Sequence, residues 1–412
     1  MSSFQILGLL ISVVAVFGYL NHRFTRLPDA IGITAIGVVV SLAAVLLSAF
    51  NAPAVASVRA VVGLIDFPGL LLHGVLGLML FAGSLHLDIA DMVAEKWLIL
   101  ALSTFGVLLS TAVVAAGFFA VTQLLGLDLP LLYCLLFGAL ISPTDPVAVL
   151  AVLKRVGVPK DMQTRIAGES LFNDGTGVVV FLTLLGLSTG PGPLDPGSTA
   201  LLFATEVLGG AVFGLVVGHL GFLMLRRVDS YSLEILITLA LATGGYTLAE
   251  VLHVSAPIAV VLMGLIVGNR GRREAMSAET RTRLFDFWEV LDELLNLLLF
   301  GLIGLKMLTL SFSPLQLAAA ACGIVIVLGA RLLSVSAPIL LAPRVRALRR
   351  PAIVIMTWGG LRGGISIALA LSLPEATGYA VVVSTTYGIV IFSILVQALT
   401  LQRVIARVLP PA

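Results

Sequence analysis

The stretch "GESLFNDGTGVVV", residues 168–180, lies inside an apolar run that is long enough to cross a membrane. It contains two carboxylic acids, Glu169 and Asp174, and an amide, Asn173, directly before the second acid. A charged side chain at the centre of a bilayer costs about 2.5–3.5 kcal/mol on insertion scales, so such residues usually serve function or pair with an opposite charge. This stretch is therefore where we look first for the function.

The composition of the whole chain is that of a membrane protein with many crossings. Apolar residues make up 59% of the 412 residues, charged residues make up 11%, and the mean hydropathy is +1.12. A soluble fold needs a polar surface on most of its helices, and this composition cannot supply one. The net charge of +2 is nearly balanced, so we expect membrane lipids and no nucleic acid as partners.

The apolar segments predict an all-α fold with thirteen transmembrane helices, each of about 20 residues. Their centres lie near residues 12, 40, 74, 110, 141, 177, 212, 241, 261, 298, 325, 363 and 393. With Arg59 and Lys306 as the exceptions, the loop lysines and arginines fall on alternate connections. By the positive-inside rule, this pattern predicts a multi-pass protein of the cell membrane with its N-terminus outside and its C-terminus in the cytoplasm.

An odd number of helices fits two inverted repeats, formed by helices 1–6 and 8–13 and joined by helix 7. The fifth helix and its counterpart, the twelfth, both contain residues that interrupt helices. The fifth carries Pro143 and Pro146 around Asp145, and the twelfth carries four glycines around Arg362. Proline removes a helix hydrogen bond and glycine lowers helix propensity. We therefore expect two broken helices near the midplane, each with a charge in the break.

Oxygen atoms in this region form a candidate cation site. Ser170 and Asp174 are four residues apart and share one face of a helix, and Glu169 and Asn173 form a second such pair. Backbone carbonyls freed near Thr144 would add further oxygen ligands, which hard cations prefer.

The buried arginines need partners, because a guanidinium cannot lose its charge. We expect Glu169 to pair with Arg362. For Arg331 two partners remain open, a carboxylate near the site or backbone carbonyls. Four other acids are predicted nearer helix ends, where contact with water is expected: Glu206, Glu234, Asp292 and Glu293.

Three motifs in order, "SPTDPVAV" (142–149), "GESLFNDGTG" (168–177) and "GGLRGGIS" (359–366), closely resemble the monovalent cation:proton antiporter superfamily in its bacterial sodium/proton exchanger (NhaP-like) branch. The segment "FWEVLDELLNLLLFGLIGLKM" (287–307) resembles helix 10 of that family. The resemblance covers the whole chain. It implies a secondary active antiporter and not an enzyme, with Na⁺ or Li⁺ exchanged for H⁺, a role in pH regulation and no cofactor.

The resemblance also implies one transmembrane domain, residues 1–412, in two parts and without a soluble regulatory domain. A moving core would comprise about 97–189 and 314–407, and a dimer-forming part about 1–90 and 199–308. In this interpretation Asp174 binds cation and proton in turn, with Ser170 and the Thr144 carbonyl as further Na⁺ ligands. Asp145 acts through water, and Asn173 holds the crossing helices together.

Two departures from relatives concern the transported ions. Some relatives carry a glutamate ligand in helix 3, where this chain has Ala82 in "LFAGSLHLD". Some also have two adjacent aspartates where this chain has Asn173 and Asp174. An amide cannot exchange a proton at physiological pH, so one cation should exchange for one proton without net charge movement.

Three alternatives stay open. The first is K⁺ as the exchanged cation in the same fold. The second is a cation channel, which would need a ring of carbonyls or charges from several subunits. The third is an intramembrane aspartyl protease with Asp145 and Asp174 as a dyad, in which Asn173 and Arg362 would have no role.

Overall fold

The computed structural model describes residues 3–48, 59–63, 65–189, 196–310, 313–341, 349–375 and 378–409. Nearly all of these residues are helical, which confirms the all-α class. Within these ranges, Asp145 and Leu361 form an isolated antiparallel β-bridge. Arg344 and Arg346, two of the loop arginines on which the predicted orientation depends, lie outside the described residues.

The helices follow one another with short connections. The first are α1 (Ser3–Leu20), α2 (Asp29–Ser48), α4 (Phe67–Gly69), α5 (Leu76–Leu85), α6 (Ile89–Ser103), α7 (Phe105–Leu124), α8 (Leu131–Ile141), α9 (Val147–Val156) and α10 (Lys160–Thr189). The next are α11 (Pro196–Leu225), α12 (Tyr231–Val251), α13 (Ala256–Ile266), α14 (Arg272–Glu274), α15 (Ala278–Lys306) and α16 (Pro314–Leu341). The last are α17 (Arg349–Trp358), α18 (Gly364–Leu371), α19 (Tyr379–Phe392) and α20 (Leu399–Val408).

Shorter helical turns of other types join or extend these helices. In the part of the chain that the structure describes, four are π-helical, namely Asn21–Thr25, Leu70–Val75, Val267–Gly271 and Ser393–Ala398, and one is a 3-10 turn, Met307–Thr309. The turn Leu70–Val75 joins α4 to α5, and the turn Ser393–Ala398 joins α19 to α20, so each pair forms one continuous helical run.

Local signals in the sequence explain several helix ends. The hydroxyl of Ser277 accepts the Thr280 N–H at 3.3 Å and caps the start of α15. Gly157 ends α9 with a φ of 75°, a left-handed conformation that glycine adopts without a steric penalty.

In the described ranges, nine helices or continuous runs are long and apolar enough to cross a membrane. The helices α8, α9, α17 and α18 are each too short to cross alone, as expected for interrupted helices. Each of the thirteen predicted centres falls in a described helix or in the break between two. The exact count of thirteen crossings and the orientation stay predictions.

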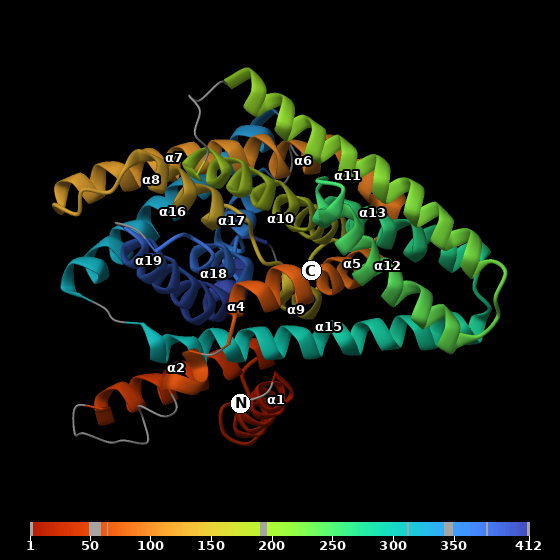
Figure 1. Ribbon diagram of the computed structural model, residues 1–412, viewed down its shortest axis with the longest axis horizontal. Helices are drawn as coiled ribbons and strands as arrows, with labels where there is room; N and C mark the ends of the chain where they lie inside the picture. The colour runs from red at the N-terminus through yellow and green to blue at the C-terminus, as the bar shows by residue number, and fades with distance from the viewer. Residues whose placement is uncertain are drawn as a thin grey trace.

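The helices pack around two hydrophobic clusters. One cluster joins α5, α12, α13 and α15, where the rings of Phe81 and Trp288 lie 4.8 Å apart. The other contains α8, α9, α10 and the helices from α16 to α20, together with α1 and α2. Figure 1 shows α15 as a long helix along one side of the bundle, with α1 and α2 beyond it. The proposed division into core and dimer-forming parts stays a prediction.

Candidate functional site

The site is built where two interrupted helices meet. The chain leaves α8 at residue 141 and enters α9 at 147, and it leaves α17 at 358 and enters α18 at 364. The backbone N–H of Asp145 donates to the carbonyl of Leu361 at 2.8 Å, so the two breaks bond to each other. Pro143 and Pro146 explain the first break, because proline has no N–H to donate. The two predicted interruptions are confirmed.

Opposite charges occupy the helix ends that the breaks expose. Arg362 donates through Nη1 to the carbonyls of Ser142 and Pro143, at 2.8 Å in the second case, just beyond the C-terminus of α8. The Asp145 carboxylate accepts the Val147 N–H at 2.9 Å, at the N-terminus of α9. A cation is favoured at a helix C-terminus and an anion at an N-terminus. The two charges therefore stabilise the broken helix ends in a place with little water.

The predicted ion pair between Glu169 and Arg362 is wrong. Glu169 instead pairs with Arg331 of α16 through two hydrogen bonds, one of them from Nη2 to Oε2 at 2.9 Å. Arg331 also donates through Nε to the carbonyl of Met356 at 3.2 Å. Both arginines line one small cavity, but the free carbonyls at the end of α8 bind Arg362. Arg331 therefore has both kinds of partner that the sequence left open, a carboxylate and a backbone carbonyl.

The structure brings the side chains of Thr144, Ser170 and Asn173 together. The Asn173 amide accepts the Thr144 N–H at 3.2 Å and donates to the Thr144 hydroxyl at 2.9 Å. That hydroxyl lies 3.1 Å from the Ser170 hydroxyl. These bonds tie the middle of α10 to the first break. The role of the Thr144 carbonyl as a ligand stays a prediction.

Asp174 lies on α10 directly after Asn173. Its side chain is buried, with 7% of its surface exposed, and among the described residues it has no hydrogen bond or ion pair. Its neighbour Asn173 bonds to Thr144, the residue before Asp145, so the Asp174 and Asp145 carboxylates belong to the same part of the site. Two carboxylates that repel each other at a site with little water favour the uptake of a proton or a cation. The arrangement can therefore bind either one.

Two acids lie in surroundings that the sequence interpretation missed. Asp292 was expected near a helix end, but α15 runs from 278 to 306 and places it 14 residues from either end. Glu234 does lie in the first turn of α12, yet it is fully buried and not in contact with water. The sequence does contain a signal for the position of Asp292 within the helix. Ser277 is a typical N-cap and lies several residues before the apolar run, which indicates that the helix begins well before Asp292. Ala82, which was named above as a departure from some relatives, is buried in α5.

The family described as "Sodium/hydrogen exchanger, transmembrane" matches residues 10–407. The chain belongs to the sodium/hydrogen exchanger family. It is 48% identical over 404 residues to the Na⁺/H⁺ antiporter NhaP of Pseudomonas aeruginosa, covering 97% of this chain and 95% of the relative. It is also 32% identical to the Na⁺/H⁺ antiporter NhaH of Halobacillus dabanensis, over 98% of this chain and 96% of that relative.

The fold of this family member is also that of a solved structure. The sodium proton antiporter MjNhaP1 from Methanocaldococcus jannaschii at pH 8 superimposes with a TM-score of 0.74. The match covers 98% of both chains at 18% sequence identity. The predicted NhaP-like fold is thus confirmed, and the family member is a multi-pass membrane protein.

Proposed function

We propose that this chain is a secondary active antiporter that exchanges Na⁺ or Li⁺ for H⁺, with both ions competing for the Asp174 carboxylate. The observation that supports this most is the state of Asp174, which is buried on a helix long and apolar enough to cross a membrane and has no hydrogen-bonding partner in the part of the chain that the structure describes. A structural carboxylate is normally paired, as Glu169 is. The relatives NhaP and NhaH are both named as Na⁺/H⁺ antiporters, which supports transport and not enzyme catalysis.

In the proposed cycle, Na⁺ binds to oxygens of Asp174, Ser170 and Thr144. Asp145 contributes through a water molecule, and Asn173 keeps α10 attached to the first break by its bonds to Thr144. When a proton binds to Asp174, its carboxyl group loses the charge that attracts Na⁺, so the cation leaves. Proton and cation therefore cannot share the site, and this exclusion couples their movements.

Alternating access would come from a movement of the core, 97–189 and 314–407, against the dimer-forming part. The two broken helices belong to the core in this proposal, so the site would move with them. We also propose a homodimer in the cell membrane, in line with the expectation from the family resemblance, and pH regulation as the physiological role.

The exchange is proposed to be electroneutral, with one cation for one proton. Glu169 is held by Arg331, and Asn173 carries no exchangeable proton at physiological pH. Asp174 alone then alternates between the two ions, and the loaded site has the same charge in both directions.

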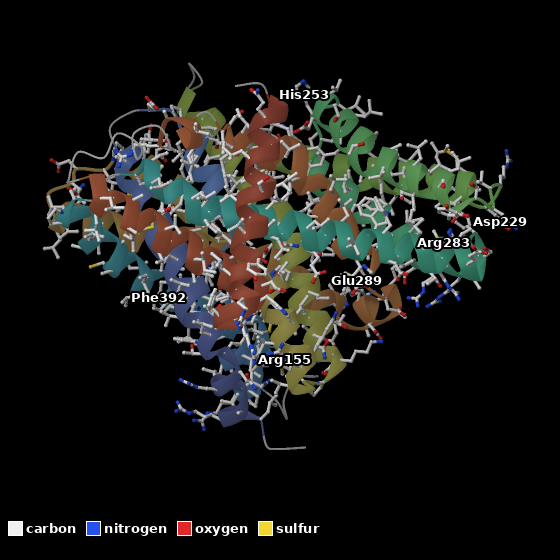
Figure 2. The ribbon with its side chains drawn as sticks, turned by 90° about the horizontal axis from the view of Figure 1, so that it is seen from below. Arg155, Asp229, His253, Arg283, Glu289 and Phe392 are labelled. Atoms are coloured by element: carbon white, nitrogen blue, oxygen red, sulfur yellow. The ribbon has the colours of Figure 1, made fainter. Side chains whose placement is uncertain are left out.

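Purified protein in liposomes with a pH gradient tests the proposal directly. Asp174→Asn should abolish cation-dependent proton movement while the protein still folds and inserts. The matched control is Asp229→Asn, an exposed acid at the edge of the molecule (Figure 2), which should exchange like the wild type. Exchange that persists in Asp174→Asn would refute the proposal.

The same assay with K⁺ in place of Na⁺ tests the second candidate function, K⁺/H⁺ exchange. The observation that favours it is Ala82, which supplies no ligand from α5. A lower KM for K⁺ than for Na⁺ or Li⁺ would make K⁺ the substrate.

A further inference from the structure

We propose that Glu234 of α12 is a second proton-binding carboxyl group, separate from the transport site, and that it makes the packing of α12 on α15 depend on pH. Protonated Glu234 would fit between the two helices, and ionised Glu234 would push their starting ends apart. The transport cycle proposed above does not use this residue.

Glu234 lies between two contacts that join α12 to α15. Three residues before it, the ring of Tyr231 lies under the guanidinium of Arg283, with 4.4 Å from Cζ to the ring centroid. Four residues after it, the Thr238 hydroxyl accepts the Trp288 Nε1–H at 3.0 Å. Residues three and four apart share one face of a helix, so Glu234 faces α15 as well. Figure 1 shows the starts of α12 and α15 meeting at one end of the bundle.

The Glu234 side chain is completely buried at this junction. The residue is 0% exposed, and neither carboxylate oxygen has a hydrogen bond to any residue that the structure describes. Leu284 and Trp288 of α15 are also fully buried and belong to the hydrophobic cluster that joins the two helices. An ionised carboxylate without a partner is costly in such surroundings, whereas a protonated one carries no charge. The packing of the two helices therefore favours Glu234 with a proton.

The charged groups around this junction do not pair with Glu234. They come from the connection before α12, from α15, from the turn Val267–Gly271, from α14 and from the residue after α5, and all are exposed: Asp229, Glu279, Arg283, Arg270, Arg272 and His86. Figure 2 shows Asp229 and Arg283 at the same end of the molecule. Arg283 pairs with Glu279 at 2.8 Å. Among the described residues Glu234 forms no ion pair, so no positive charge holds it ionised.

Thr280 offers a partner to the protonated acid. It is buried one turn before Leu284, on the face of α15 that is turned to α12, and its hydroxyl acts on the Glu234 carboxyl group. A protonated carboxyl group has an O–H that can donate to this hydroxyl, and an ionised one does not. The Thr280 hydroxyl also lies 3.2 Å from that of Ser277, which caps α15. A proton on Glu234 would thus connect α12 to the cap of α15.

The helix α15 leads from this junction to the broken helices. An ionised Glu234 would draw water between α12 and α15 and separate their starts. From Leu284 the helix continues without interruption to Leu299, which packs so closely on Gly364 of α18 that a Cβ at that glycine would overlap it. These two leucines are about 22 Å apart at the rise of an α-helix. One continuous helix therefore joins the pH-dependent contact to the second break.

Tryptophan fluorescence of the purified full chain in detergent tests the proposal, because Trp288 bonds to Thr238 one turn from Glu234. The chain has three tryptophans, so Trp97→Phe with Trp358→Phe leaves Trp288 as the reporter. Its emission should shift to longer wavelength between about pH 5 and about pH 9, as the buried acid ionises and water enters. Glu234→Gln, which stays neutral, should abolish the shift. The matched control Asp286→Asn, an exposed acid of α15, should keep it.

Two results of this experiment would overturn the proposal. One is an emission that does not change with pH before Glu234 is replaced. The other is a shift that persists in Glu234→Gln.

Thermal unfolding checks the same residue with all three tryptophans in place. The unfolded chain ionises a glutamate above about pH 4.3, whereas the folded chain holds Glu234 neutral to higher pH. The unfolded state then binds fewer protons, so Glu234 lowers the stability as the pH rises. The Tm of Glu234→Gln minus that of the wild type should therefore grow with pH. A difference that stays constant with pH would contradict the proposal.

The variant Asp174→Asn separates this inference from the proposed function. It removes the carboxyl group proposed to carry the transported ions, and both pH effects should remain in it. Adding Glu234→Gln to that variant should then remove both. If the effects disappear with Asp174→Asn alone, the titrating group is Asp174 and the proposal for Glu234 fails. If exchange is absent from the wild type, the proposed function fails, and the fluorescence and Tm still decide this question.

Discussion

Replacing Glu169 by glutamine removes the negative partner of Arg331 with almost no change in volume. In the structure the glutamate is 1% exposed and the arginine 7%, and two hydrogen bonds join them. After the substitution Arg331 keeps its bond to the Met356 carbonyl and loses its charge partner. Breaking a buried pair from one side typically costs about 3–5 kcal/mol, because the remaining charge stays buried.

The assay is thermal unfolding of the purified protein in detergent, with Asp174→Asn for comparison. That variant removes an acid that has no ion-pair partner, so its Tm should equal or exceed the wild-type value. Glu169→Gln should melt well below both. A Tm for Glu169→Gln at or above that of Asp174→Asn would refute the reasoning.

A double-mutant cycle identifies the partner. Glu169→Gln combined with Arg331→Gln should cost much less than the sum of the two single changes, with a coupling of roughly 1–3 kcal/mol. The same cycle with Arg362→Gln should show a smaller coupling, because Arg362 donates to backbone carbonyls. Equal couplings would mean that both arginines share Glu169.

Three further predictions concern transport in proteoliposomes. Lowering the pH should raise the apparent KM for Na⁺ while the maximal rate at saturating Na⁺ is retained, as for competition at Asp174; a loss of maximal rate alone would argue against one shared site. With fixed ion gradients, the balance point should not move between zero and about 100 mV of either sign; a shift would mean that a second proton moves. Gly363→Ala should lower exchange because its Cβ would overlap the Asp145 carboxylate, whereas Gly329→Ala, which has open space, should not; equal rates would contradict this.

The sequence was sufficient for those features that depend on neighbouring residues. The breaks follow from Pro143 and Pro146 and from the glycines around Arg362, and the shared face of Ser170 and Asp174 follows from helix geometry. The spacing of basic residues likewise predicts alternating loops, without any knowledge of packing.

The partner of Glu169 could not be predicted in this way. Two arginines, Arg331 and Arg362, lie in different helices far along the chain, and either could reach the acid. What decides between them is the set of carbonyls that the end of α8 exposes, and those positions depend on how the broken helices cross. The position of Asp292 was missed for a different reason, because the polar first turns of α15 do not look like part of a membrane helix.

The charges around the crossing have a consequence for leakage. Glu169 with Arg331 sums to zero, and so does Asp145 with Arg362, which leaves Asp174 as the one unbalanced charge of this group. Under the proposed cycle the group is neutral when Asp174 holds either a proton or Na⁺, and it carries one negative charge when Asp174 is empty. An uncompensated charge is costly to move through a medium of low dielectric constant. The empty carrier would therefore stay on its side of the membrane, and the gradient would not be lost through futile return steps.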